Sequence, residues 1–434
     1  MKINKTYDTH ILYAMDQYIK SLDKAVYGKI AQETMRESIQ VYYNKKKQSI
    51  IGKELDSEDV NKNGELDKII DSYTKILNHP LPSMYTGDIM HTLIQTYRIR
   101  GQYHAGKGEM KKALYDFTRA ITLKPDDDEV YVFRAHVYLD RNKLEKAIED
   151  FTTALTLKPG CIETHTLRAN ACLKQGDFEK AIEDFSVIIA NKPDFIDIYA
   201  LRGYAYFKKE NFDKAIEDFT TVIAVQSDRF NAYDLRGKAY FKKEMLDEAL
   251  ADFNKVIELK PDYADAYCCR GCVYIRRNDL DQTIADASKA IELDPTIPEA
   301  FGLRGDAYNK KDEFDKAIED SNRALEIDPD YALIYCNRGL AYVGKEMTEN
   351  ALRDFNRAVK LDPNNADIYC GRGSGYILKG ALDEAIADFT TAIKLDPDNA
   401  EAYYGRSGAY SAKASADLAM AIELDPDYAD TSHL

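Results

Sequence analysis

The chain of 434 residues contains no tryptophan, only seven cysteines, and no run of 18 apolar residues. An odd number of cysteines without regular spacing argues against a disulfide framework, and the missing apolar run argues against a membrane-spanning helix. Met1 to Gln17 also lacks the apolar core of a secretory signal. These absences favour a reduced, cytoplasmic setting and no membrane partner.

Basic residues are fewer than acidic ones: the chain has 59 Lys and Arg and 74 Asp and Glu, which gives a formal net charge of −15. The first 93 residues carry 13 residues of each sign, so the whole excess lies in the remainder. An acidic surface repels phosphate backbones, so nucleic acid is not expected as a partner. No nucleophile elbow, phosphate loop or zinc-protease motif is present, so we expect neither an enzyme nor a cofactor or metal.

One pattern dominates what is present: an arginine recurs every 34 residues, at Arg100, Arg134, Arg168, Arg202, Arg236, Arg270, Arg304, Arg338, Arg372 and Arg406. A period of this length indicates stacked supersecondary units. In the unit that begins at Asn231, apolar residues three to four apart predict one helix as far as Lys243. A second amphipathic helix begins near Leu246 and ends at Pro261, which cannot continue the hydrogen-bond ladder. Each unit is therefore a helical hairpin that must stack on its neighbours to bury its apolar face.

Small and bulky residues occupy fixed slots in these units. Glycine follows the arginine in most of them, as in Gly203 and Gly237, while an alanine such as Ala249 and a phenylalanine such as Phe253 recur in the second helix. With the first aromatic (Tyr233) and the terminal proline, this order resembles the tetratricopeptide repeat family over roughly 94–427, in ten units. The resemblance implies an all-α, right-handed superhelical solenoid.

The predicted organisation has two parts. Residues 1–93 are expected to form an irregular helical N-terminal region with a degenerate repeat near 64–80, and residues 94–434 a ten-repeat array. Ala287 and Ser321 replace the core phenylalanine in repeats six and seven, where packing must differ. The last repeat is truncated: Lys413 to Ala416 stand where repeat nine has Lys379 to Ala387. Its end face either frays or pairs with a second chain as a homodimer.

The resemblance also implies a concave groove lined by the first helix of each hairpin. In this family, ligands contact the second, fifth, ninth, twelfth and thirteenth positions of the unit. The matching residues of repeats four to six are Asp197, Tyr204, Phe207, Lys208, Asp234, Lys238, Phe241, Lys242, Asp265, Cys268, Cys272, Ile275 and Arg276. Apolar anchors flanked by charges suit an extended or helical peptide. The alternative is that Phe207 and Phe241 belong partly to the core.

The family's carboxylate clamp for heat-shock chaperone tails is not expected. It needs lysine at the second position of a repeat, and no repeat has one there. Most repeats carry an acid instead: Glu129, Glu163, Asp197, Asp265, Glu299, Asp367 and Glu401. This acidic row predicts protein or peptide partners with basic residues and a salt-sensitive association.

The expected function is therefore a non-enzymatic scaffold that binds partner proteins in its groove. Two alternatives remain: a structural protein that self-associates through the uncapped C-terminal face, and a regulatory subunit of an enzyme complex. Whether the C-terminal Ser432-His433-Leu434 acts as an address signal is left open.

Three further patterns have structural explanations that we prefer. Nine of the ten repeat arginines precede an aspartate by sixteen residues, as Arg202 precedes Asp218, which favours structural ion pairs over a phosphate-binding comb. Asp59 to Asp67 begins like a calcium loop, but Ile70 stands where the bidentate carboxylate belongs. Cys268 and Cys272 share a helical face without histidine at a finger-like spacing, so they are expected to be small groove-lining or core residues.

Overall fold

The computed structural model describes residues 66–67, 70–71, 74 and 83–424. Between residues 83 and 424 it contains nineteen helices, and the described residues include no strand. The chain divides into two compact units, Met1–Lys243 and Glu244–Leu434. Within the described ranges, no helix combines the length and apolarity needed to cross a bilayer.

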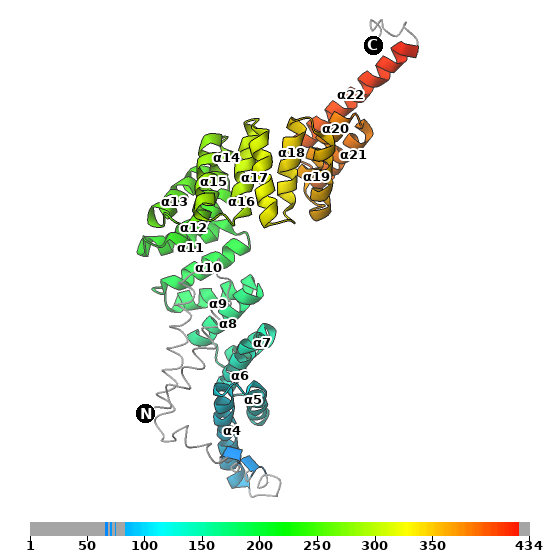
Figure 1. Ribbon diagram of the computed structural model, residues 1–434. Helices are drawn as coiled ribbons and strands as arrows, with labels where there is room; N and C mark the ends of the chain where they lie inside the picture. The colour runs from blue at the N-terminus through cyan, green and yellow to red at the C-terminus, as the bar shows by residue number, and fades with distance from the viewer. Residues whose placement is uncertain (1–65, 68–69, 72–73, 75–82, 425–434) are drawn as a thin grey trace. The chain divides into compact units, whose positions relative to one another are not determined.

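The helices are drawn in Figure 1. Unit 1 contains α4 (Ser83–Gly106), α5 (Met110–Leu123), α6 (Asp128–Asp140), α7 (Leu144–Leu157), α8 (Ile162–Gln175), α9 (Phe178–Asn191), α10 (Ile196–Lys208), α11 (Phe212–Val225) and α12 (Phe230–Lys242). Unit 2 contains α13 (Leu246–Leu259), α14 (Ala264–Arg276), α15 (Leu280–Leu293), α16 (Pro298–Lys310), α17 (Phe314–Ile327), α18 (Ala332–Gly344), α19 (Thr348–Leu361), α20 (Ala366–Lys379), α21 (Leu382–Leu395) and α22 (Ala400–Leu424).

Consecutive helices pair as hairpins. Unit 1 holds α4–α5, α6–α7, α8–α9 and α10–α11, and unit 2 holds α14–α15, α16–α17, α18–α19 and α20–α21. The second helix of one hairpin packs on the first helix of the next, and in unit 2 the first helices α14, α16, α18, α20 and α22 also contact one another in sequence. The predicted all-α solenoid of stacked hairpins is thereby confirmed.

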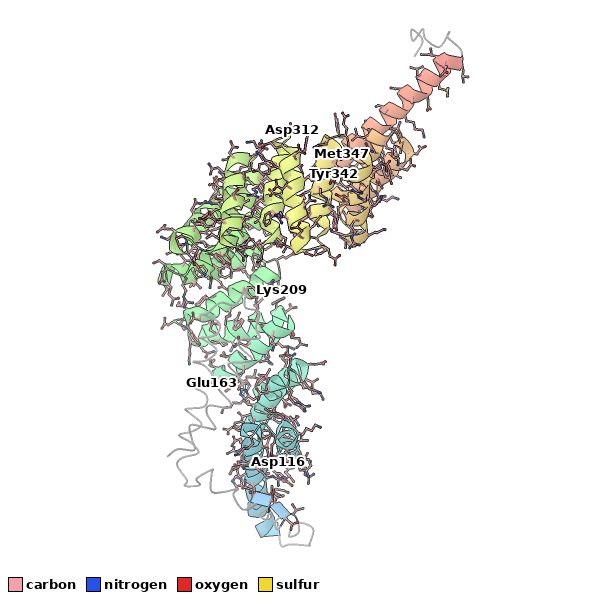
Figure 2. The ribbon with its side chains drawn as sticks, viewed as in Figure 1. Asp116, Glu163, Lys209, Asp312, Tyr342 and Met347 are labelled. Carbon is pink, nitrogen blue, oxygen red and sulfur yellow. The ribbon has the colours of Figure 1, made fainter. Side chains whose placement is uncertain are left out.

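The turn inside each hairpin holds one residue with positive φ, always at the same place in the repeat. Glycine fills this place in three repeats, whereas six carry a side chain there: Asn142, Glu210, Glu244, Asn278, Asp312 and Glu346, with φ between 54° and 60°. Residues with a side chain cost roughly 1–2 kcal/mol in this left-handed conformation. Figure 2 labels Asp312 in one of these turns.

The aspartates that precede proline in the second half of the array form turns. Asp294 Oδ1 accepts a hydrogen bond from the Thr296 backbone N–H at 2.9 Å, and Asp328 Oδ1 accepts one from the Asp330 N–H at 3.1 Å. Asp362 and Asp396 repeat this arrangement. A short carboxylate that bonds the backbone two residues on closes a turn locally. Most repeats of the first half have a lysine at this place, Lys124, Lys158, Lys192 and Lys260, which cannot accept such a bond.

Phenylalanine rings fill the core of the hairpins, and glycine makes room for them. Phe355 is fully buried. A Cβ on Gly339, in the same repeat, would lie 2.8 Å from its Cε1, and one on Gly371, in the next repeat, 2.5 Å. Because neither glycine has a side chain, the ring is held between two helices at close approach.

Repeats six and seven fill the same space differently, as the sequence predicts. Ala287 and Ser321 are fully buried but small. A Cβ on Gly271 of repeat six would meet the Leu303 side chain of repeat seven at 2.8 Å, and one on Gly302 would meet Ile334 of repeat eight at 2.4 Å. Aliphatic side chains of the following repeat therefore lie against these two glycines.

Most of the repeat arginines bond to residues of two other helical segments. In eight repeats the Nε and Nη2 groups of this arginine meet both carboxylate oxygens of the aspartate sixteen residues later, as in Arg202–Asp218 at 2.9 and 2.8 Å. Its Nη1 group donates to the preceding repeat, for example from Arg202 to Ser186 Oγ at 3.2 Å. The same holds for Arg100–Asp116, Arg134–Asp150, Arg168–Asp184, Arg270–Asp286, Arg304–Asp320, Arg338–Asp354 and Arg372–Asp388. The predicted structural ion pairs are confirmed; Asp116 is labelled in Figure 2.

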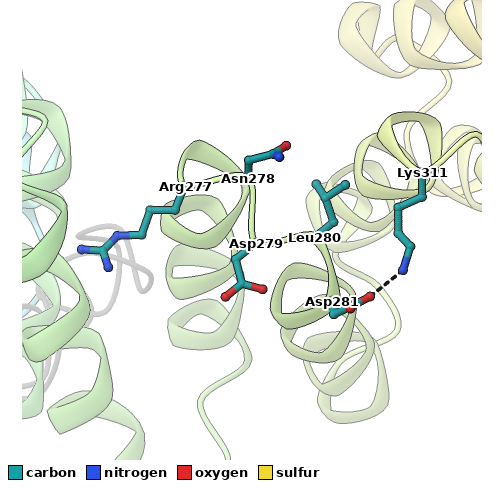
Figure 3. Close-up of a pocket in the computed structure, with 6 residues that line it drawn as sticks. All are labelled: Arg277, Asn278, Asp279, Leu280, Asp281 and Lys311. Atoms are coloured by element: carbon teal, nitrogen blue, oxygen red, sulfur yellow. Dashed lines mark hydrogen bonds and ion pairs between the residues drawn. The ribbon is translucent and has the colours of Figure 1, made fainter.

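A second series of ion pairs, here called the turn pairs, links neighbouring repeats at the surface. From Glu210 to Gly380, the basic residue before each positive-φ residue reaches an acid thirty residues earlier, as in Lys209–Glu179 at 3.3 Å and Lys311–Asp281 at 2.5 Å. Their carboxylates are exposed, so each pair adds little stability in water. Figures 2 and 3 show Lys209 and Lys311 at these turns.

The truncated repeat is one unbroken helix. α22 runs through the place where the other repeats turn, and its second half extends past the ends of α20 and α21 (Figure 1). Its first half packs on α21, with Ala402 and Ala409 fully buried.

Few residues upstream of α4 are described. Ile70 joins the core cluster of Leu93, Ile94 and Tyr97, and Asp67 pairs with Arg100 at 2.5 Å. The irregular region 1–93, the degenerate repeat near 64–80 and the calcium-like loop lie largely outside the described residues, as does Ser432-His433-Leu434. The two-part organisation and the cap stay predictions.

Candidate partner-binding surface

The thirteen groove residues predicted from the sequence divide between the two units, eight in unit 1 and five in unit 2. All lie on first helices of hairpins, α10, α12 and α14. At 100° per residue the five chosen positions fall within one arc of about 100°, so they share a helical face. How far each side chain can reach a partner depends on its burial.

Three of the thirteen are buried. Tyr204 is 7% exposed and lies in the core cluster of unit 1, Asp234 is 6% exposed, and Cys268 is 7% exposed. Neighbouring first helices pack closely enough to cover them. These residues support the surface, but their side chains are too buried to contact a partner.

The accessible residues of unit 1 are the ends of α10 and α12. Lys208 and Lys242 are exposed, while Phe207 and Phe241 are half-buried. The Lys208 ammonium lies over the Tyr204 ring, 5.5 Å from its centroid, and Phe207 meets Phe212 edge to face at 5.6 Å. Asp234 holds Lys238 Nζ at 2.9 Å. The Phe207 ring is therefore partly a core residue, as the alternative interpretation holds.

In unit 2 the surface begins on α14. Asp265, Cys272 and Ile275 are half-buried, and Arg276 is exposed and pairs with Glu244 at 3.4 Å. Burial raises the pKa of the Cys268 thiol to about 12 and that of Cys272 to about 11, so both are protonated at neutral pH. Their burial agrees with the interpretation of these cysteines as small packing residues.

The acidic row at the second position behaves differently in the two units. In unit 1, Glu129 pairs with Arg98 at 3.2 Å and Asp197 pairs with Arg229 at 2.6 Å. In unit 2, Glu299, Asp367 and Glu401 are exposed, and Asp367 accepts a hydrogen bond from Asn399 at 3.4 Å. The carboxylates of Glu299, Asp367 and Glu401 are therefore more accessible to a partner than those of Glu129 and Asp197.

The structure adds an apolar row that the sequence-based selection missed. Leu333 and Leu340 on α18 are 44% and 37% exposed, and Leu378 on α20 is 46% exposed. They stand at the second, ninth and thirteenth positions, and α18 contacts α20. The same positional rule applied to repeats eight and nine would have found them; the selection stopped at repeat six.

Asp306 on α16, at the ninth position of repeat seven, lies beside this row. Burial raises its pKa above the usual range, and Lys310, one turn further along, acts against that shift. Among the described residues, no basic group lies within ion-pair distance of its carboxylate. An incoming cation would supply the ion pair that this half-buried carboxylate lacks among the described residues.

Outside this face, the turn after α14 carries a shallow depression lined by Arg277, Asn278, Asp279, Leu280, Asp281 and Lys311 (Figure 3). Lys311 spans it to bond Asp281. It is polar and open, Arg277 and Lys311 belong to turn pairs, and Asp279 accepts a hydrogen bond from the Gln282 backbone N–H. It offers no enclosed site for a small molecule.

Sequence profiles of the tetratricopeptide repeat match most of the array. Those described as TPR repeat cover 237–276, 305–346 and 373–413, and those described as tetratricopeptide repeat cover 134–194, 196–229, 264–297 and 332–365. Together they span more than half of the chain. The chain belongs to the tetratricopeptide repeat family.

Solved structures give the same fold. A tetratricopeptide repeat protein from Parabacteroides merdae is 17% identical, with a TM-score of 0.50 over 57% of this chain and 98% of that one. The Cut9–Hcn1 hetero-tetramer of the APC/C (14%, 0.45, 81% and 95%) and the C-terminal part of a repeat protein from Cytophaga hutchinsonii (22%, 0.40, 55% and 97%) are also similar. Among curated protein sequences there is no match. The repeat architecture supports a protein-interaction scaffold in general terms.

Proposed function

We propose that the chain is a non-enzymatic scaffold that binds segments of partner proteins on the face formed by the first helices of its hairpins. The observation that carries the proposal is the row of exposed leucines on α18 and α20, Leu333, Leu340 and Leu378, at positions where core packing does not need them. Exposed apolar side chains on adjacent helices, bordered by charge, are typical of a surface that a partner covers.

The charges beside this row specify the partner further. Asp306, Glu299 and Asp367 border the leucines and carry negative charge, and no basic residue within one turn neutralises Glu299 on α16. A partner segment with apolar residues spaced along a helix or strand, together with Lys or Arg, would satisfy both features. Its association should weaken as salt is raised, because exposed charges are screened.

The thirteen residues selected from the sequence remain part of the proposal within their own units. In unit 1 the accessible candidates are Phe207, Lys208, Phe241 and Lys242, and in unit 2 they are Asp265, Cys272, Ile275 and Arg276. Because Tyr204 lies in the core, Phe241→Ala tests the unit 1 surface better than a variant that also removes Tyr204.

The experiment is capture of binding proteins from the native lysate with three matched baits. Leu340→Glu places a charge in the leucine row, and Leu395→Glu makes the same change at a leucine of equal exposure, 38%, at the end of α21. A partner kept by the wild type and Leu395→Glu but lost from Leu340→Glu supports the proposed surface. Equal retention by all three baits, or equal loss from both variants, contradicts it.

The basic preference is tested on the same partner with Asp306→Asn. This variant removes one negative charge and leaves the leucines in place, so the dissociation constant should rise by about tenfold at low salt and by less at high salt. Unchanged binding would contradict the role of Asp306. Circular dichroism of each bait verifies that the helices are intact.

A further inference from the structure

α22 lacks the turn that every other hairpin has. Its sequence aligns with repeat nine at both ends: Lys413 matches Lys379 of α20, and Ala416 matches Ala387 of α21. Five residues between these points, including the counterpart of the turn residue Gly380, are absent. The chain cannot reverse its direction there, so a first-helix sequence and a second-helix sequence continue as one helix.

The second-helix half of α22 therefore exposes residues that belong in a hairpin core. Its Ala414, Asp417 and Leu418 match Ala385, Asp388 and Phe389 of α21, which are 0%, 6% and 1% exposed. In α22, Ala414 and Asp417 are exposed and Leu418 is half-buried. Met420 and Leu424 beside them are 57% and 79% exposed.

The first-helix half of α22 exposes the complementary face. Tyr403 and Tyr410 are 46% and 55% exposed, and Ser407 between them is exposed as well. Arg406 is in the position of the repeat arginine. Its contacts among the described residues are the Tyr403 ring, 5.5 Å to the centroid, and Thr390 Oγ1 at 3.4 Å; no described carboxylate lies within ion-pair distance.

We propose that a second copy of this chain covers these surfaces, with two α22 helices packed antiparallel so that the first half of each forms a hairpin with the second half of the other. One chain cannot close this hairpin, because its two halves are collinear. A second copy supplies both missing halves at once, and the resulting interface is isologous, as in most homodimers.

The register of the repeat fixes how the two helices meet. Arg372 bonds Asp388, and Gly373 lies against Phe389 in repeat nine. The same register brings Arg406 of one chain to Asp417 of the other, and Ser407 to Leu418. Both pairings place the two-fold axis near Ala412, so every contact occurs twice. The residues around the axis, Ser411, Ala412, Ala414, Ser415 and Ala416, are small enough for close helix packing.

Side-chain size also agrees with this register. In repeat nine, glycine faces phenylalanine, whereas in α22 the facing residues are Ser407 and Leu418. Ser407 is larger than the glycine it replaces, and Leu418 is smaller than the phenylalanine it replaces. The pair Arg406–Asp417 likewise restores for both residues the charge partner that the repeat provides elsewhere.

The first test is the mass of the full chain by sedimentation over a range of concentrations. The wild type should dimerise, and Arg406→Asp or Asp417→Arg should each raise the dimer dissociation constant at least about tenfold by placing like charges opposite one another. The double variant carrying both changes restores opposite charges and should recover the dimer. Glu423→Arg, a reversal at an exposed position of the same helix, is the matched control and should leave the dimer intact.

The second test restores the turn. Inserting the five residues Gly-Ala-Leu-Asp-Glu between Lys413 and Ala414 reproduces the spacing of repeat nine, so each chain can close its own hairpin and should become a monomer with unchanged helicity. The double variant Ser407→Cys and Leu418→Cys should form a disulfide between the two chains. A bond within one chain is impossible, because the two positions are about 16 Å apart along one helix.

A wild type that stays monomeric at all concentrations overturns the proposal. So does a dimer that persists in both single charge reversals and in the insertion variant, because that dimer would use another surface. Coverage of α22 by a different protein in place of a second copy also overturns it. Leu340→Glu, at the proposed partner surface, should not change the mass, so the two proposals fail separately.

Discussion

Arg338 and Asp354 bond through two parallel contacts, Nε to Oδ2 at 2.6 Å and Nη2 to Oδ1 at 3.0 Å, and the aspartate side chain is only 4% exposed. The remaining Nη1 group donates to Asn322 Oδ1 of the preceding repeat at 2.6 Å. This one guanidinium therefore holds α18, α19 and α17 together, and removing its partner leaves a charge with little access to water.

We expect Asp354→Ala to lower the free energy of unfolding by about 3 kcal/mol, because removing one member of a buried ion pair leaves the other charge unpaired. The measurement is urea denaturation followed by circular dichroism. Asp330→Ala is the control: its carboxylate pairs with Arg357 at 2.8 Å but is 74% exposed, so its removal should have little effect. Similar losses in both variants would contradict this account.

The contact between Phe355 and Gly371 predicts strong coupling between the two positions. Gly371→Ala should cost about 1–3 kcal/mol because its methyl group would lie 2.5 Å from the ring. Phe355→Leu should cost about 1 kcal/mol through the lost ring contacts. The double variant should be less destabilised than the sum, and a double-mutant cycle in urea measures the difference. Simple additivity would show that the ring does not fill this space.

The turn residue Glu346, with φ of 56°, predicts a stabilising substitution. Glu346→Gly should raise the midpoint of thermal unfolding by removing the strain of a side chain in the left-handed region, a gain of up to about 1 kcal/mol. Gly380→Ala, at the equivalent turn of repeat nine, should act in the opposite direction. A loss of stability in Glu346→Gly would mean that contacts of its side chain outweigh the strain.

His165 predicts a pH dependence of stability. Its Nδ1 lies 2.6 Å from Asp184 Oδ1, and this contact raises the pKa of the histidine above its usual range. Protonated His165 therefore stabilises the fold fully below about pH 6.5, and that contribution disappears as pH rises through the higher folded-state pKa. His165→Gln should remove this fall in stability above pH 6.5, as urea midpoints between pH 6 and 8.5 would show.

His136 should act in the opposite sense at acid pH. Burial lowers its pKa to about 4, so the unfolded chain binds a proton more readily than the folded one between about pH 6.5 and 4. Stability should fall as pH decreases through this window. In His136→Leu the part of the fall that depends on this residue should vanish, whereas the fall above pH 6.5 due to His165 should remain.

Most of the fold could be predicted from the sequence because the same residue pattern recurs in ten repeats. The recurrence of Arg202 and Asp218 at fixed spacing in other repeats indicated an ion pair even though neither residue alone would have done so. The missing phenylalanine at positions 287 and 321 likewise indicated altered packing. Which side chains pack against the neighbouring helix there, as Leu303 does against Gly271, could not be predicted, because it depends on how closely the next helix approaches.

The site was harder to predict because a position in the repeat does not determine burial. Tyr204 and Leu340 both occupy the ninth position, yet one is 7% and the other 37% exposed. The difference depends on the size of the neighbours on adjacent first helices and on their local approach. The sequence predicts which helical face a partner contacts, whereas the accessibility of each residue on that face had to come from the structure.

In repeats six to eight, side chains of one repeat pack against the repeat before it, and this has a consequence for the order of the repeats. Leu303 completes the packing beside Gly271, and Ile334 completes that beside Gly302, so each hairpin depends on the one that follows it. Excising repeat seven, or grafting it elsewhere in the array, would leave a void in its neighbour, so this stretch can be redesigned only as a block.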